Sequence, residues 1–149
     1  MSGRFSYDPG ARLLTVDDRR FPARSFDGTW GAHDVVYGEH AHCTRRVRVM
    51  LENGYQLSLI WGSGTYSDNY DHTFGQPQAF VEEPERVEVG VYGPERGGEL
   101  LELGDPESGY TDSVAGYCTT DDVLRLIRVV SMLSTSEVPE VIEFAREGS

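Results

Sequence analysis

The stretch from Gly62 to Gly75, GSGTYSDNYDHTFG, combines glycine, hydroxyl, carboxylate, amide and aromatic side chains in a pattern typical of binding loops. Its glycines can bring backbone N–H groups close to a phosphate. The usual phosphate loop also needs a Lys followed by Ser or Thr, and the chain has no lysine. Because long loops in compact domains are often functional, we predict a binding loop rather than a simple strand connection. The predicted binding residues are Thr65, Tyr66, Ser67, Asp68, Asn69, Tyr70 and His72.

Two histidines in the segment GEHAHC are the first candidates for metal binding. His40 and His42 are two residues apart, so on a strand both imidazoles would point to the same side. His72 is the third candidate, and Asp68 and Asp71 could complete such a site. Two solvent-facing histidines on an edge strand explain the spacing more simply. We expect no bound cofactor, and the sequence leaves the metal open.

Neither cysteine has the sequence context of a catalytic nucleophile. Cys43 and Cys118 lie far apart, and in a reducing compartment we expect both to be free. Cys118 precedes a predicted helix, whose dipole would lower the pKa of a thiol, but a small buried apolar role is the simpler interpretation. Ser, His and Asp residues occur in no recognisable hydrolase order. The sequence therefore favours a protein that is not an enzyme.

The distribution of charge narrows the class of partner. The net charge is −12, which opposes binding to nucleic acid and to anionic membranes. Residues 1–50 contain eight Arg and six acids, whereas residues 80–112 contain ten acids and two Arg. Such a run is usually a solvated face, but it also suits a cationic protein partner. All 13 basic residues are Arg, which indicates a GC-rich genome more than a choice of contacts.

The hairpin around Asn53-Gly54 can be predicted to the register. A two-residue turn would pair Arg48 with Leu59 and mix arginines with apolar side chains. A three-residue loop, Glu52 to Gly54, pairs Val49 with Leu57 instead, and Gly54 takes the left-handed position. The apolar face then consists of Val47, Val49, Leu51, Tyr55, Leu57, Leu59 and Trp61. We expect this buried face to direct the segment after Trp61 outward.

Further strands are expected before and after this hairpin. The segment from Phe5 to Val16 predicts a hairpin whose DPGA turn uses Gly10 for a positive φ. Residues 87–91 predict a strand that buries three valines, with residues 99–103 as its hairpin partner and residues 112–117 as a last short strand.

In the C-terminal part of the chain, the spacing of apolar residues changes from a period of two, typical of strands, to a period of 3.6, typical of helices. Thr119 or Thr120 should cap a helix whose apolar stripe is Val123, Leu124, Ile127, Val130 and Leu133. Residues 134–148 predict a second, shorter helix with Pro139 in its first turn. The sequence therefore predicts an α+β fold in one domain, residues 1–149: an antiparallel sheet of hairpins with one or two C-terminal helices packed on one face.

No run of about 18 apolar residues, as a membrane-spanning helix requires, occurs in the chain. The N-terminal residues MSGRFSYDPG contain no apolar signal core, so we expect a cytoplasmic protein.

The segments ENGYQLSLIWGSGTYSDN and TTDDVLRLIRVVSML, with an acidic strand hairpin between them, resemble small uncharacterised proteins of actinobacteria and their phages. The resemblance covers residues 52–133 and implies a shared fold and a phage or actinobacterial setting. It transfers no activity.

Two functional hypotheses follow. The first is a non-enzymatic accessory or host-interaction protein that binds a basic protein partner through its acidic surface and aromatic loop. The alternative is a nucleotide- or metal-binding protein that uses the Gly62–Gly75 loop and the nearby histidines. The identity of the partner and the oligomeric state stay open.

Overall fold

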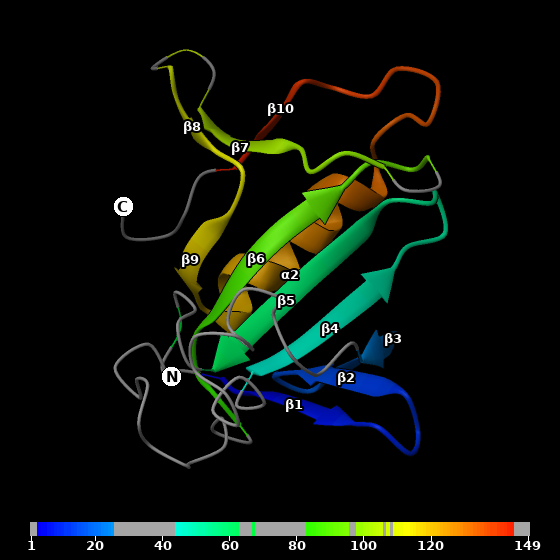
Figure 1. Ribbon diagram of the computed structural model, residues 1–149, viewed down its shortest axis with the longest axis vertical. Helices are drawn as coiled ribbons and strands as arrows, with labels where there is room; N and C mark the ends of the chain where they lie inside the picture. Colours follow the sequence, from blue (N-terminus) through cyan, green and yellow to red (C-terminus); the bar gives the residue numbers. More distant parts are fainter. Residues whose placement is uncertain are drawn as a thin grey trace, which may run out of the picture.

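The computed structural model describes residues 3–25, 44–62, 67, 83–95, 98–105, 107 and 109–144. Within this part of the chain, seven strands form an antiparallel sheet, and a helix, α2 (Thr120–Ser131), lies against one face of it behind β5 and β6 (Figure 1). In order across the sheet the strands are β1 (Phe5–Asp8), β2 (Leu13–Val16), β3 (Arg19–Ser25), β4 (Thr44–Met50), β5 (Gln56–Gly62), β6 (Val87–Tyr92) and β9 (Ala115–Cys118). The predicted class, α+β with an antiparallel sheet and a helix on one face, is confirmed.

The register of the β4–β5 hairpin is the predicted one. Val49 pairs with Leu57, and the N–H of Leu51 donates to the carbonyl of Tyr55 at 2.9 Å. Gly54 has a φ of 91°, as the bulge of a three-residue loop requires. The alternative register would have placed arginines in the core, at a cost that no local contact offsets.

The apolar face selected by this register forms the centre of the core. Trp61 and Tyr55 are fully buried, as are the valines and leucines that lie beside them on β4, β5 and β6. Burying a side chain of this size contributes about 1.5–3 kcal/mol relative to leaving it exposed. The helix covers this face with Val123, Leu126, Ile127 and Val130. The predicted stripe is confirmed at Val123, Ile127 and Val130. It missed Leu126, which is fully buried, whereas Leu124 is only partly buried and Leu133 lies beyond the end of the helix.

The helix begins where the sequence predicted. Thr119 is the N-cap: its hydroxyl accepts a hydrogen bond from the N–H of Asp122 at 3.2 Å, and the Asp122 carboxylate accepts one from the N–H of Thr119 at 3.0 Å. This reciprocal pair satisfies two of the donors that a helix start leaves without an intrahelical partner.

The predicted N-terminal hairpin is present, with Phe5 paired with Val16, but its turn differs from the prediction. The positive φ falls on Arg12, at 54°, and not on Gly10. The reason is the side chain of Asp8, which accepts a hydrogen bond from the N–H of Gly10 at 2.9 Å and so shapes the first half of the turn.

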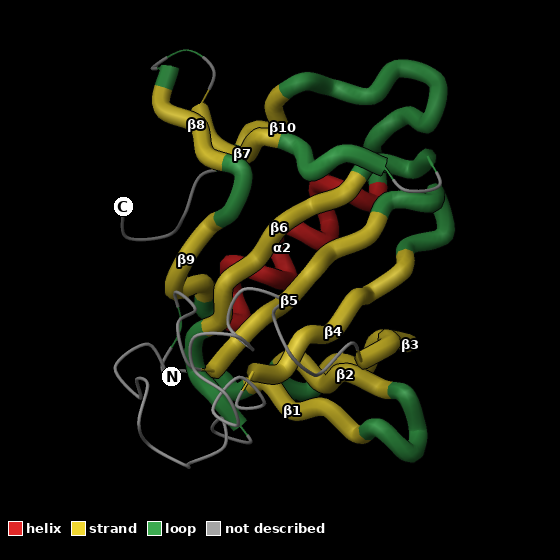
Figure 2. The backbone as a smooth tube through the Cα atoms, in the orientation of Figure 1, coloured by secondary structure: helices red, strands yellow, loops and turns green. Residues whose placement is uncertain are grey.

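The predicted second helix is wrong. Residues 132–140 form an irregular connection, green in Figure 2, that leads to a strand, β10 (Val141–Glu143). The hydroxyl of Ser134 accepts hydrogen bonds from the N–H groups of Ser136 and Glu137, at 3.1 and 3.3 Å, and these bonds form a local turn near the start of the connection. Ile142 and Phe144 are buried, whereas Val138 is 39% exposed, so burial follows the period of a strand.

The strand β10 belongs to a second, three-stranded sheet. Its order is β10-β7-β8, with β7 (Glu102–Asp105) parallel to β10 and antiparallel to β8 (Tyr110–Asp112). Residues 99–103, the predicted hairpin partner of β6, therefore pair with it over a short length only. There the N–H of Leu101 donates to the carbonyl of Val91 at 2.8 Å. The chain then leaves the first sheet because Leu103, 4% exposed, is buried between its neighbours in the second sheet.

Candidate functional site

The predicted binding loop falls almost wholly outside the described residues. This applies to Thr65, Tyr66, Asp68, Asn69, Tyr70 and His72. Ser67 is described: it is buried, and its hydroxyl accepts a hydrogen bond from the N–H of Gly62 at 3.3 Å. Trp61 is fully buried at the end of β5, as the hypothesis of an outward loop requires. The loop stays a prediction.

The predictions for the histidines and for Cys43 also cannot be compared with described residues. His40, His42, His72, Asp71 and Cys43 all lie outside the described residues, so the metal site also stays a prediction. Among the residues that the structure describes, no group of three or more His, Cys, Asp or Glu side chains could hold a metal ion. Cys118 is buried at the end of β9, as a small core residue would be, and its thiol lies 3.6 Å from the carbonyl oxygen of Ala115.

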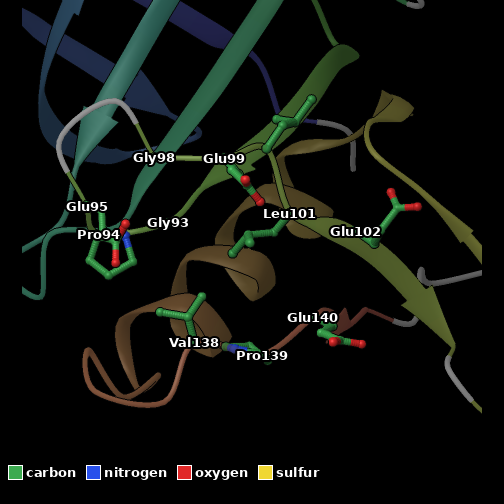
Figure 3. Close-up of a pocket in the computed structure, with 11 residues that line it drawn as sticks. Gly93, Pro94, Glu95, Gly98, Glu99, Leu101, Glu102, Val138, Pro139 and Glu140 are labelled. Carbon is green, nitrogen blue, oxygen red and sulfur yellow. The ribbon is translucent and has the colours of Figure 1, made fainter.

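A groove of about 680 Å³ lies between two segments of the described structure. One wall consists of residues 93–95 and 98–102, which follow β6 and lead into β7. The other is the segment Val138–Glu140, which precedes β10 (Figure 3). The two walls are about 40 residues apart in the sequence and meet because β10 pairs with β7.

The turn that forms the first wall is closely packed. The N–H of Gly98 donates to the carbonyl of Glu95 at 2.7 Å, and the N–H of Gly93 donates to the carbonyl of Glu99 at 3.1 Å. A Cβ atom on Gly98 would lie 2.5 Å from the carbonyl oxygen of Gly93 and 2.8 Å from that of Glu95. A side chain at this position would force the backbone around it to shift, so the close approach of these segments depends on glycine.

Four carboxylates and several apolar side chains line the groove together. The acidic residues are Glu95, Glu99, Glu102 and Glu140. The apolar residues are Pro94, Leu100, Leu101, Val138 and Pro139. Two of the large apolar side chains are unusually open for their type, Leu100 at 37% and Val138 at 39% exposure. Leu101 and Val138 lie on facing walls (Figure 3).

The charge of the groove is not neutralised within the described structure. None of the four carboxylates makes a hydrogen bond or ion pair with another described residue. The described lining contains no Arg, Lys or His; Arg96, which follows Glu95, lies outside the described residues. In a smaller cavity that shares Gly98 with the groove, the guanidinium of Arg48 lies 4.4 Å from the ring centre of Tyr92 on the sheet.

Half of this site could be anticipated from the sequence. The excess of acids over residues 80–112 predicted an acidic surface, and the first wall lies within that run. The second wall was missed because residues 134–148 were assigned to a helix. Pro139 was the available signal, because the residue before a proline is biased toward extended backbone.

Comparison with known proteins found no matching protein family, curated protein or solved structure. Within the described residues, no helix has the length and apolar character needed to cross a membrane.

Proposed function

We propose that this chain is a non-enzymatic binding protein that receives a basic, partly apolar segment of a protein partner in the acidic groove. The observation that carries the proposal is the groove itself: four carboxylates without a partner among the described residues, beside leucine and valine side chains that are open to solvent. An accessory or host-interaction role in a phage or actinobacterium belongs to the same proposal.

The chemistry of the lining defines the segment it would accept. Arg and Lys side chains combine a cationic end with an apolar stem, so a single side chain can contact both a carboxylate and Leu101. A groove of about 680 Å³ has the size of a site for a few side chains. A peptide that alternates Arg with Leu or Val matches this lining.

The charged and apolar contacts contribute in different ways. Ion pairs between exposed groups contribute about 0.2–1 kcal/mol each and are weakened by salt. Their main effect is on the rate of association, because the acidic surface attracts a cationic partner before contact. Burial of Leu100, Leu101 and Val138 would supply most of the affinity and slow the dissociation.

A peptide-binding measurement tests the proposal. The probes are fluorescent peptides rich in Arg and Leu, and the binding is followed by anisotropy at low and at physiological salt. The variant Glu99→Gln/Glu140→Gln removes two groove charges without changing side-chain size. Neutralising both should weaken binding about fivefold or more, and raised salt should reduce the difference.

The control is Glu52→Gln/Glu107→Gln, which makes the same change of net charge at two exposed glutamates outside the groove. It should stay within about twofold of the wild type. An equal loss in the two double variants would mean that overall charge, not the groove, attracts the peptide. Absence of binding by every basic peptide would overturn the proposal.

A further inference from the structure

A second cavity of opposite charge lies at the exposed face of the helix. Its volume is about 360 Å³, and it is bounded by α2 and by the first residue of β3. The lining residues are Arg19, Asp121, Leu124, Arg125 and Arg128. Three guanidinium groups in one small cavity are unusual in a chain with a net charge of −12.

The helical period brings four of these residues together. Asp121, Leu124, Arg125 and Arg128 are spaced i, i+3, i+4 and i+7, so they form one stripe along α2. The opposite stripe of α2 is buried in the core. The arginines therefore cannot turn inward, and their side chains extend from the solvent side of the helix.

Arg19 comes from a different element, and the packing of its turn explains its position. The β2–β3 turn lies close to the start of α2: a Cβ atom on Gly3 would be 2.6 Å from Oγ1 of Thr120 and 2.9 Å from Oδ1 of Asp17. Asp17 has a positive φ of 61°, so the turn is tightly formed. Arg19 lies two residues after Asp17, so this turn places it beside α2, where it lines the cavity.

The cavity has an excess of positive charge. Among the described residues of its lining, Asp121 is the one acidic residue, against three arginines. Within the described structure, the guanidinium groups of Arg19 and Arg128 make no hydrogen bond or ion pair. Like charges gathered on one surface repel each other, and a bound anion would remove this cost.

We propose that this cavity binds a small phosphorylated molecule through its phosphate group. A phosphate dianion offers several oxygens at once, and the planar guanidinium group is suited to paired hydrogen bonds with them. A volume of about 360 Å³ leaves room for an organic part beside the phosphate, and Leu124 gives that part an apolar contact. The site is separate from the acidic groove and does not depend on the function proposed for it.

Isothermal titration at constant ionic strength tests this assignment. The probes are phenyl phosphate, inorganic phosphate and benzoate. Phenyl phosphate should bind saturably with one site per chain, more tightly than inorganic phosphate because the ring contacts Leu124. Benzoate, with a single charge, should bind at least about tenfold more weakly than phenyl phosphate, since hydrogen bonds to charged groups contribute about 1.5–3 kcal/mol each.

Single substitutions locate the site. Arg19→Gln and Arg128→Gln should each weaken phenyl phosphate binding about tenfold or more. Arg20→Gln is the matched control, because Arg20 is exposed and adjacent to Arg19 but does not line the cavity. All three arginines are exposed, so the variants should keep the thermal unfolding midpoint of the wild type. No saturable binding of phenyl phosphate, or an equal loss in Arg20→Gln, would overturn the proposal.

Discussion

The side-chain amide of Asn53 donates a hydrogen bond to the carbonyl oxygen of Val130 at 2.9 Å and a second to that of Leu133 at 3.3 Å. Asn53 lies in the turn between β4 and β5, whereas Val130 lies in the last turn of α2 and Leu133 lies two residues beyond the helix. The carbonyl of Val130 also accepts a hydrogen bond from the N–H of Leu133 at 3.1 Å, so a turn 77 residues earlier in the sequence adds a second donor at the end of the helix. The hairpin thus fixes the end of the helix as well as the centre of the core.

Replacing Asn53 should therefore destabilise the whole domain. Asn53→Ala leaves two helix-end carbonyls without this donor, and we expect the free energy of unfolding to fall by about 1–2 kcal/mol. Urea denaturation followed by circular dichroism measures the change. Glu52→Ala, in the same turn but exposed, should change stability by less than about 0.5 kcal/mol. Equal effects of the two substitutions would show that the side-chain contact is unimportant.

The hairpin also shows which parts of this fold can be predicted from sequence. The pairing of Val49 with Leu57 followed from polarity alone, because the other register would bury arginines. The N-cap at Thr119 followed from local side-chain chemistry. Both features depend on residues that are close in the sequence, so the pattern contains the necessary information.

The second sheet could not be predicted in this way. The pairing of β10 with β7 joins segments about 40 residues apart, and Val141 and Ile142 suit an amphipathic helix and a strand equally well. Burial of Ile142 beside Leu103 distinguishes the two, and this contact joins segments that are distant in the sequence. The acidic groove depends on this pairing, so only its charge could be predicted.

Tyr55 gives a prediction about pH. Burial raises the pKa of its phenol, whose hydroxyl donates to the carbonyl of Ser134 at 2.6 Å. The pKa in the unfolded chain is about 10, so the unfolded state loses this proton first as the pH rises. The contribution to stability is therefore complete below about pH 10 and is lost as the pH rises through the folded pKa.

The measurement compares the free energy of unfolding between about pH 8 and pH 11 in the wild type and in Tyr55→Phe. The wild type should lose stability more steeply than the variant above about pH 10. Tyr117→Phe, which removes a hydroxyl from an exposed tyrosine, is the control and should follow the wild-type curve. Parallel curves for the wild type and Tyr55→Phe would refute the link to Tyr55.

The two glycines of the groove wall should respond differently to the same substitution. Gly98→Ala places a Cβ atom 2.5 Å from a backbone oxygen, so the turn must shift, at a cost of about 1–3 kcal/mol. On Gly93 a Cβ atom would meet only Cγ1 of Val138, at an ordinary 3.8 Å. We expect Gly98→Ala to lower both stability and affinity for basic peptides, and Gly93→Ala to preserve both. Thermal unfolding and peptide anisotropy measure the two effects, and a similar result for both variants would contradict a rigid wall.

Ile142 connects the second sheet to the groove. A substitution at this residue should therefore affect the acidic groove and leave the arginine cavity unchanged. Ile142 is 1% exposed and pairs with Leu103, so Ile142→Ala should cost about 2–4 kcal/mol through lost burial and the cavity left behind. Because β10 holds the wall formed by Val138–Glu140, the variant should also bind basic peptides more weakly than Glu143→Ala, an exposed change in the same strand. The arginine cavity lies on α2 and β3, outside this sheet, so titration with phenyl phosphate should be unchanged in the folded variant. Weakening of both ligands together would mean that Ile142 supports the whole domain and not the groove in particular.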